Sequence, residues 1–403
     1  MTKQEISELI LKDFDIDPER GFLPSYEPRP PIPSVYPPAV LAEQGLALPK
    51  IIASGNIREM FMPGLGEAPK VDLKFLKNDR QALDEVMRYF SFLAHAYVYS
   101  PGEEPAKILP ASIAVPLCKC ANLLGRPAVL SYASYALNNW YRIDRSRPIE
   151  FGNIAVAQNF LGGLDEDWFI MVHVDIEARA GKIPAECLNE IKTRTEKTAP
   201  FASMALALIA QRQEKMLETI RRMPEHCDPY IYYTRVRPYL FGWSERSPLP
   251  GGLIYEGVEE FGGEPQKFFG ETGAQSSVVP VLYAYLGIEF KKDGFLNYLM
   301  EMRKYMPSGH RKFIEFLESM NVKWGTLREY FMKTGDIYKE SVYNRCVDLL
   351  VEFLEAHYDF AKRYIADQEQ KSVTNPAAIG TGGTMFLDYL KEHIEDVKAH
   401  RIV

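Results

Sequence analysis

Apolar residues recur at intervals close to 3.6 positions over most of this chain, which is the spacing of an amphipathic helix. The pattern is clearest in four long segments, 80–98, 183–222, 282–305 and 338–366. Strand-like alternation is confined to three short pieces, 51–55, 129–133 and 252–255. There is no sustained βαβ pattern and no internal repeat of about 20–50 residues. We therefore predict a mainly α fold in which any sheet is small.

Prolines and glycines mark the interruptions between these segments. Pro200 is a candidate first residue for a helix inside 183–222, and Gly287 closes an apolar helical run. Residues 23–40 contain seven prolines and are expected to be extended or looped, because proline fixes φ and lacks an N–H donor. A polar, glycine-rich connection over 367–384 leads to a final helix that begins near Met385.

Breaks near residues 122–127 suggest a division into domains. The 403 residues exceed the roughly 100–200 of a single ordinary domain. We expect a smaller, mixed but mostly α domain over residues 1–125 and a larger helical domain over residues 126–403.

Composition and charge exclude several classes of partner. The formal net charge is -7, and no dense block of Lys and Arg alternates with aromatic residues, so nucleic acid is not an expected partner. No stretch reaches the ~18 apolar residues of a membrane span. The start, MTKQEISELILKDFDID, lacks the basic and apolar regions of a signal peptide. We expect a cytoplasmic, monomeric protein without a membrane partner.

The five cysteines are predicted to be free, buried thiols. They are scattered along a chain too large to need disulfide bonds. Cys118 and Cys120 form the only close pair, and no second Cys or His pair lies at the spacing of a zinc site.

His357 lies within an apolar stripe of the predicted helix over 343–366. The stripe runs at spacings of 4, 3, 4 and 3 through Leu350, Leu354, His357, Ala361 and Tyr364. A neutral imidazole that faces the interior is either a core histidine bonded to a carbonyl or a ligand of haem or metal. Spacing alone favours the core histidine.

His173 is a second inward-facing histidine. It shares one helical face with Phe169, Val172 and Ile176, and beside a cavity it can exchange a hydrogen bond with a small polar ligand. A satisfied core histidine is the plainer interpretation. The sequence His173-Val174-Asp175 also matches two ligands of a non-haem iron site. Residues two apart on a helix point in different directions, which argues against joint ligation.

The other histidines are weaker candidates. His95 lies in the apolar run YFSFLAHAYVY and is predicted to be a core residue. Polar contexts place four more at the surface, namely His226, His310, His393 and His400.

Two glycine-rich segments and one arginine complete the candidates. Segments 269–277 and 380–384 each precede a predicted helix, where N–H groups and Thr hydroxyls bind carboxylate, phosphate or propionate groups. An ordinary capping turn is the plainer interpretation of each, and neither contains the Lys expected for a nucleoside triphosphate. Arg237 lies in an aromatic stretch and needs an anionic partner if it is buried, although spacing does not separate it from Arg235.

Seven ordered segments carry a family resemblance that covers about residues 20–395. They are RGFLP (20–24), LSYASYALNNW (130–140), RPYLFGW (237–243), FGETGAQSS (269–277), MPSGHRKF (306–313), AHYDFAKRYI (356–365) and GTGGT (380–384). Together they resemble the indoleamine 2,3-dioxygenases. The resemblance implies a two-domain, mainly helical haem protein with the haem in the larger domain. It further implies a dioxygenase that uses O2 to cleave the indole C2=C3 bond of tryptophan to N-formylkynurenine, the first step of the kynurenine pathway.

The resemblance also implies individual roles. By motif match His357 is the proximal ligand of the haem iron, and Thr272 and Gly273 line the haem edge. Arg237 matches the arginine that pairs with the substrate carboxylate, which a guanidinium binds in a bidentate manner. Other residues matched to the substrate site are Tyr132, Phe169, Tyr232, Gly380, Thr381 and Gly382.

Three positions depart from the family pattern. His173 occurs where many members carry a small hydroxyl residue, and so resembles the distal histidine that binds the indole N–H in tryptophan 2,3-dioxygenases. Met385 follows GTGGT where an acidic residue is common, and Tyr135 replaces a smaller residue. These changes bear on the size of the pocket and on its preferred substrate.

Other functions stay open at this point. A haem oxygenase of the same fold could act on another indole derivative, or the chain could be a haem or tryptophan sensor without turnover. Arg237 and the complete GTGGT segment favour an α-amino-acid substrate over both. The sequence does not distinguish D-tryptophan from L-tryptophan.

Overall fold

The computed structural model describes residues 2–28, 39–55, 57–60, 76–195, 201–334, 337–371 and 386–403. In the first part of the chain its helices are α1 (Lys3–Glu8), α2 (Ala39–Ser54), α3 (Ile57–Met60), α5 (Arg80–Val98) and α6 (Ala111–Leu124). The following helices are α7 (Leu164–Ala180), α8 (Ile183–Thr195), α9 (Phe201–Ile220), α10 (Pro229–Ile231), α11 (Val278–Leu286), α12 (Gly294–Met302), α13 (Ser308–Trp324), α14 (Leu327–Thr334), α15 (Ile337–Tyr364) and α16 (Phe386–Lys398). The fold is mainly α, as predicted.

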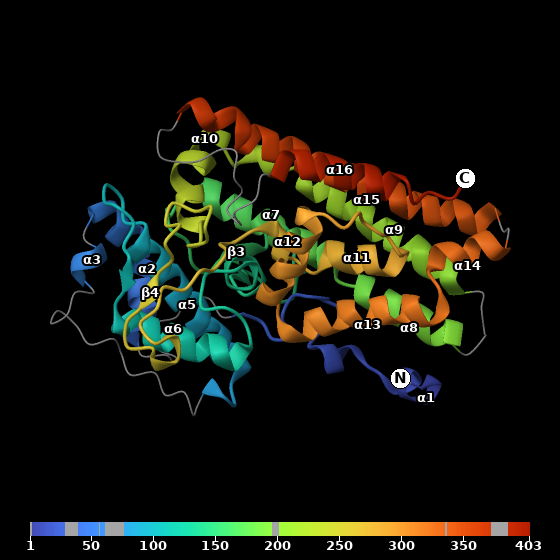
Figure 1. Ribbon diagram of the computed structural model, residues 1–403, viewed down its shortest axis with the longest axis horizontal. Helices are drawn as coiled ribbons and strands as arrows, with labels where there is room; N and C mark the ends of the chain where they lie inside the picture. Colours follow the sequence, from blue (N-terminus) through green and yellow to red (C-terminus); the bar gives the residue numbers. More distant parts are fainter. Residues whose placement is uncertain are drawn as a thin grey trace.

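The long helix α15 is the centre of the larger helical part. Its 28 residues pack against α9 on one side and α16 on another, and α7 packs against α9 in turn. Figure 1 shows α9, α15 and α16 running alongside one another, with α11, α12 and α13 beneath them. Helices α2, α5 and α6 gather at the other end of the molecule.

Strands are few and short in the described residues. β1 (Ile108–Leu109) pairs in parallel with β4 (Ile254–Tyr255), and β2 (Trp140–Arg142) pairs antiparallel with β3 (Ile154–Val156). The strand expected within 252–255 is therefore present as β4. Its partner β1 comes from the amino-terminal part of the chain, so this ladder connects residues far apart in sequence.

The helical pattern located the main elements well. α5 spans the predicted 80–98, and the side chain of Asp79 caps it by accepting a hydrogen bond from the Ala82 N–H at 2.9 Å. The 183–222 segment contains α8 and α9. The 282–305 segment is divided, because Gly287 adopts a left-handed conformation (φ 71°) that ends α11, and Asp293 caps the start of α12.

Two of the three predicted strands are wrong. Residues 51–54 continue helix α2, in which Leu48 and Ile52, four residues apart, form one buried face. Residues 129–133 lead into a π-helix over Ala133–Leu137, and the Leu130 N–H donates to His95 Nε2 at 3.1 Å instead of to a neighbouring strand. Short apolar runs do not distinguish these possibilities. The division into domains at residues 125 and 126 stays a prediction.

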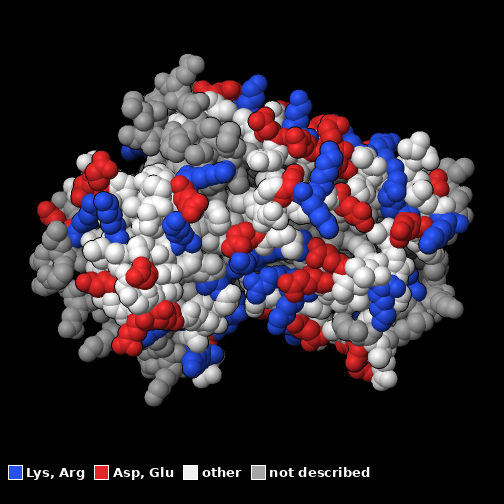
Figure 2. Space-filling view, in the orientation of Figure 1, with Lys and Arg blue, Asp and Glu red and all other residues white. Residues whose placement is uncertain are grey.

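The face of the molecule drawn in Figure 2 carries charges of both signs. Figure 2 shows Lys and Arg interspersed with Asp and Glu over the face drawn. Within the described ranges, no helix has both the length and the apolar character needed to cross a bilayer.

Candidate functional site

A cavity of about 510 Å³ lies inside the larger helical part. Its wall is formed mainly by apolar and aromatic side chains of α7, α9, α11, α12, α15 and α16, together with the loop before α11. This volume falls within the roughly 300–1,000 Å³ of known small-molecule and cofactor sites.

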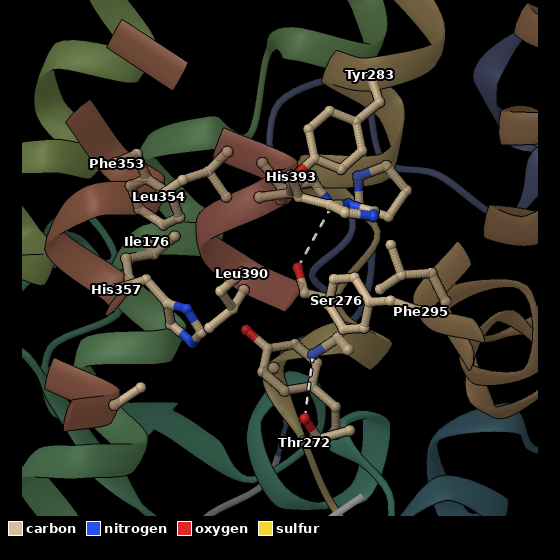
Figure 3. A pocket seen from close by; sticks show the side chains of 18 of the residues that line it. Ile176, Thr272, Ser276, Tyr283, Phe295, Phe353, Leu354, His357, Leu390 and His393 are labelled. Atoms are coloured by element: carbon tan, nitrogen blue, oxygen red, sulfur yellow. Dashed lines mark hydrogen bonds between the residues drawn. The ribbon is translucent and has the colours of Figure 1, made fainter. Parts of the chain in front are cut away.

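His357 projects from α15 into this cavity. The stripe predicted around it is real: Leu354, Ala361 and Tyr364 line the same wall. Figure 3 shows the imidazole directed toward the loop that carries Thr272 and Ser276. The His357 side chain is exposed to the cavity but enclosed by the surrounding protein. This enclosure, helped by the nearby His173, lowers the pKa of His357 to about 4, so the imidazole is neutral at pH 7 and has a lone pair for a metal ion.

An aromatic wall with one histidine faces the cavity from α7 and two π-helical turns. Phe169 lies 4.5 Å from the ring of His173 and 4.7 Å from that of Tyr232, and Tyr132 lies 5.8 Å from His173. Tyr132 directly precedes the π-helix Ala133–Leu137, and Tyr232 begins another at Tyr232–Val236. Such bulges often occur at functional sites. The structure thus brings these four predicted residues together.

The orientation of His173 is fixed by its own helix. Its Nδ1 lies 2.8 Å from the carbonyl oxygen of Phe169. Because a carbonyl only accepts, Nδ1 carries the proton, and burial lowers the pKa of the ring so that the neutral form dominates. Nε2 of His173 is therefore a hydrogen-bond acceptor beside the cavity.

The loop before α11 is held against the 237–243 segment by close backbone contact. The Trp243 N–H donates to the Phe268 carbonyl at 2.9 Å, and the Glu271 N–H donates to the Leu240 carbonyl at 3.0 Å. Any Cβ on Gly270 would lie 2.1 Å from the Leu240 oxygen, so only glycine allows this approach. Beyond it, Thr272 caps the short helix Gly273–Gln275, and both Thr272 and Gly273 line the cavity.

Buried carboxyl groups surround the aromatic wall. Glu177 accepts hydrogen bonds from the hydroxyls of Tyr132 at 3.0 Å and Ser276 at 2.7 Å. Burial raises its pKa to about 7, and burial raises the pKa of Glu271, which lines the cavity, to about 8. Burial likewise raises the pKa of Glu166 to about 7.

Arg237 is fully buried, whereas Arg235 is exposed, so the structure separates the two arginines that spacing could not. The Arg237 guanidinium lies 4.6 Å from the ring of Phe241 and 5.3 Å from that of Tyr233. Burial lowers its pKa to about 10, which still leaves it charged at pH 7. Among the described residues, Arg237 is not one of those that line the cavity, but it is near enough to the lining residue Tyr232 for the two to interact electrostatically.

Some predicted residues cannot be placed and others lie elsewhere. Gly380, Thr381, Gly382 and Met385 fall outside the described residues. Tyr135 is buried behind Phe169, with its hydroxyl 3.3 Å from Glu166. The carboxylate of Asp175 accepts from Thr219 at 2.6 Å and Arg179 at 3.2 Å, so it does not converge with His173 on a common ion.

The surface histidines were predicted with mixed success. His226 is exposed, but His310 and His393 are each only 3% exposed, which corrects the prediction. The amino-terminal segment covers His310, because Gly309 beside it packs against the backbone of Phe14. His95 is a core histidine bonded to the Tyr239 carbonyl, as predicted.

Sequence reasoning missed several polar residues in and beside the cavity, of which three matter most here. Glu177 follows His173 by four residues, and this spacing was a usable signal. His393 belongs to a stripe of α16 with Leu390, Ile394 and Val397, which also points inward. Glu271 had no such signal, since its burial depends on the backbone contact at Gly270.

Comparison with known proteins gives a consistent result over nearly the whole chain. The sequence profile of the family described as indoleamine 2,3-dioxygenase matches residues 10–399. The chain is 32% identical to indoleamine 2,3-dioxygenase 1 of Rattus norvegicus and 33% identical to that of Mus musculus, over 96% of this chain and 94% of each relative. Indoleamine 2,3-dioxygenase of Saccharomyces cerevisiae is 29% identical over 95% of this chain and 92% of its own length.

Proposed function

The chain belongs to the indoleamine 2,3-dioxygenase family, and from this premise we propose that it is an oxygen-incorporating oxidoreductase that cleaves the indole ring of tryptophan. The observation that supports this most directly is the cavity, with His357 on one wall and the aromatic wall of Tyr132, Phe169 and Tyr232 on another. The product would be N-formylkynurenine, and the co-substrate would be O2.

We propose haem b as the cofactor, and the residues present fit it. A porphyrin needs a large apolar chamber and an axial ligand. The cavity supplies the first, and the neutral imidazole of His357 supplies the second. None of the hydrogen bonds among the described residues engages that imidazole, whereas a structural core histidine such as His95 has both ring nitrogens bonded. Thr272 and Gly273 would lie against the same group. When bound, the ferrous haem supplies the site at which O2 is activated.

The protein's own residues would orient the substrate. The Nε2 atom of His173 is an acceptor, and the indole N–H is a donor, so the two are complementary. The rings of Phe169 and Tyr232 would hold the indole, in the manner of stacked or tilted aromatic pairs. Holding the ring in one position near the activated oxygen is the main task of such a site.

Arg237 is proposed to bind the substrate carboxylate, and Gly380, Thr381 and Gly382 to close over the amino-acid end. A buried guanidinium with aromatic neighbours pairs strongly with a carboxylate when one arrives. Arg237 directly follows the π-helical turn that begins at Tyr232, and Tyr232 lines the cavity. The proposal for the three loop residues rests on motif match alone.

The experiment for this function uses ¹⁸O₂ with the haem-loaded protein and L-tryptophan. Both oxygen atoms should appear in N-formylkynurenine, as detected by mass spectrometry. One labelled atom in the product would identify a monooxygenase, and haem binding without tryptophan-dependent O2 uptake would identify a sensor. Either result would contradict the proposal.

A further inference from the structure

His393 on α16 is a buried histidine with an unused hydrogen-bonding atom. The side chain is 3% exposed and lines the same cavity as His357. Its Nε2 has no hydrogen-bond partner among the residues that the structure describes. A buried polar atom in this position is normally satisfied by a neighbour or by a ligand.

The ring of His393 is held firmly in place. It stacks on Phe290 with the centroids 4.3 Å apart and the planes within 11°, and it meets Phe295 edge-on at 4.5 Å. Both phenylalanines also line the cavity. An imidazole fixed between two aromatic rings has little freedom to turn toward another partner, so the direction of Nε2 is preset.

The surroundings of His393 act on its pKa in opposite directions. Burial lowers its pKa, while the carboxylates of Asp293 and Asp396 oppose that effect. Whether neutral or protonated, the ring has an N–H available, since a neutral imidazole can place its proton on Nε2.

Two other donors on this part of the wall are already engaged. Arg303 lines the cavity. Its two terminal nitrogens donate hydrogen bonds to the carboxylate of Glu318 at 3.0 and 2.7 Å. The Asn321 amide donates to the Ala284 carbonyl at 2.6 Å. His393 therefore offers a donor that none of the described residues uses.

We infer that Nε2–H of His393 donates a hydrogen bond to one of the two carboxylate groups of the porphyrin that occupies this cavity. The inference rests on the proposed function, because it requires haem b in the cavity. It assigns His393 as a cofactor-binding residue on α16, on a different helix from the iron ligand on α15. The flanking Phe290 and Phe295 would pack on the apolar periphery of the same group.

The test compares haem with its dimethyl ester, in which both carboxylates are blocked while the iron and the ring are unchanged. Wild type, His393→Phe and His393→Gln are each loaded with both porphyrins, and the rate of loss to an excess of a haem-scavenging protein is followed through the Soret band. Wild type should lose the ester about tenfold faster than haem. In His393→Phe this ratio should fall severalfold, because one of the two carboxylates has lost its donor, and His393→Gln, which keeps an N–H donor, should restore part of it.

A matched control separates the hydrogen bond from packing. Leu390→Ala removes an apolar side chain from the same helix and cavity, and should speed the loss of both porphyrins while leaving their ratio as in wild type. An unchanged ratio in His393→Phe would overturn the inference. Failure of the proposed haem site is distinguishable, because wild type would then show no protein-bound Soret band with either porphyrin.

Discussion

His173 on α7 and His357 on α15 face one cavity, and they lie close enough for His173 to contribute to the lowered pKa of His357. The two imidazoles have different surroundings. Nδ1 of His173 is bonded to the Phe169 carbonyl, whereas the ring of His357 is open to the cavity. This arrangement suits the roles proposed above, with His173 toward the substrate and His357 toward the iron.

If His173 accepts a hydrogen bond from the indole N–H, its removal should weaken the preference for tryptophan over 1-methyltryptophan. Wild type should prefer tryptophan over 1-methyltryptophan, because the methyl group removes the N–H that donates to Nε2. In His173→Ala the preference in kcat/KM should fall by about three- to tenfold, while the haem stays bound. Phe169→Leu, as the control, should slow both substrates alike. Complete loss of haem from His173→Ala would contradict this role.

The role of Arg237 predicts a dependence on the substrate carboxylate. Arg237→Met keeps most of the buried volume but removes the charge, and should raise KM for tryptophan by about 30-fold or more. Tryptamine, which lacks the carboxylate, should be affected little. If the variant loses activity toward tryptophan and tryptamine in the same proportion, Arg237 supports the fold and does not bind the carboxylate.

The buried carboxyl of Glu177 predicts a pH-dependent stability. Its pKa is about 7 in the folded protein, against 4.5 for the unfolded chain, so between these values the folded state binds more protons. The stability that it contributes is therefore full below about pH 4.5 and is lost as the pH rises toward 7.

Urea unfolding of the haem-free chain checks this prediction. The free energy of unfolding of wild type relative to Glu177→Gln should fall with rising pH, by up to about 1.4 kcal/mol for each unit between these pKa values. The control is Glu218→Gln at an exposed position of α9. A difference between wild type and Glu177→Gln that does not vary with pH would show that the carboxyl titrates normally.

The backbone contact at Gly270 predicts a large effect of one methyl group. Gly270→Ala should destabilise the protein by more than about 2 kcal/mol, because its Cβ meets the Leu240 oxygen and the Gly242 nitrogen. Gly273→Ala is the matched control in the same loop, since a Cβ there meets no atom within 4 Å. Equal thermal stability of the two variants would show that the loop does not depend on this close approach.

The sequence predicted most of what depends on local periodicity. The extent of α5, the inward face around His357 and the shared face of Phe169 and His173 all follow from helical spacing. The predictions of strands at 51–55 and 129–133 were wrong because five-residue apolar runs fit a helix face equally well. The burial of Glu271, Arg237 and His310 depends on segments that meet only in the folded chain. Such contacts leave no periodic signal.

The most direct test of the central claim follows the optical spectrum of the haem-loaded protein. The protein is reduced without air, mixed with L-tryptophan and then exposed to air. The account predicts a Soret band and growth of the near-ultraviolet absorption of N-formylkynurenine, and predicts that His357→Ala abolishes product formation and alters the Soret band of the ferrous protein. A His357→Ala variant with the spectrum and turnover of wild type would contradict the assignment of His357 as the iron ligand.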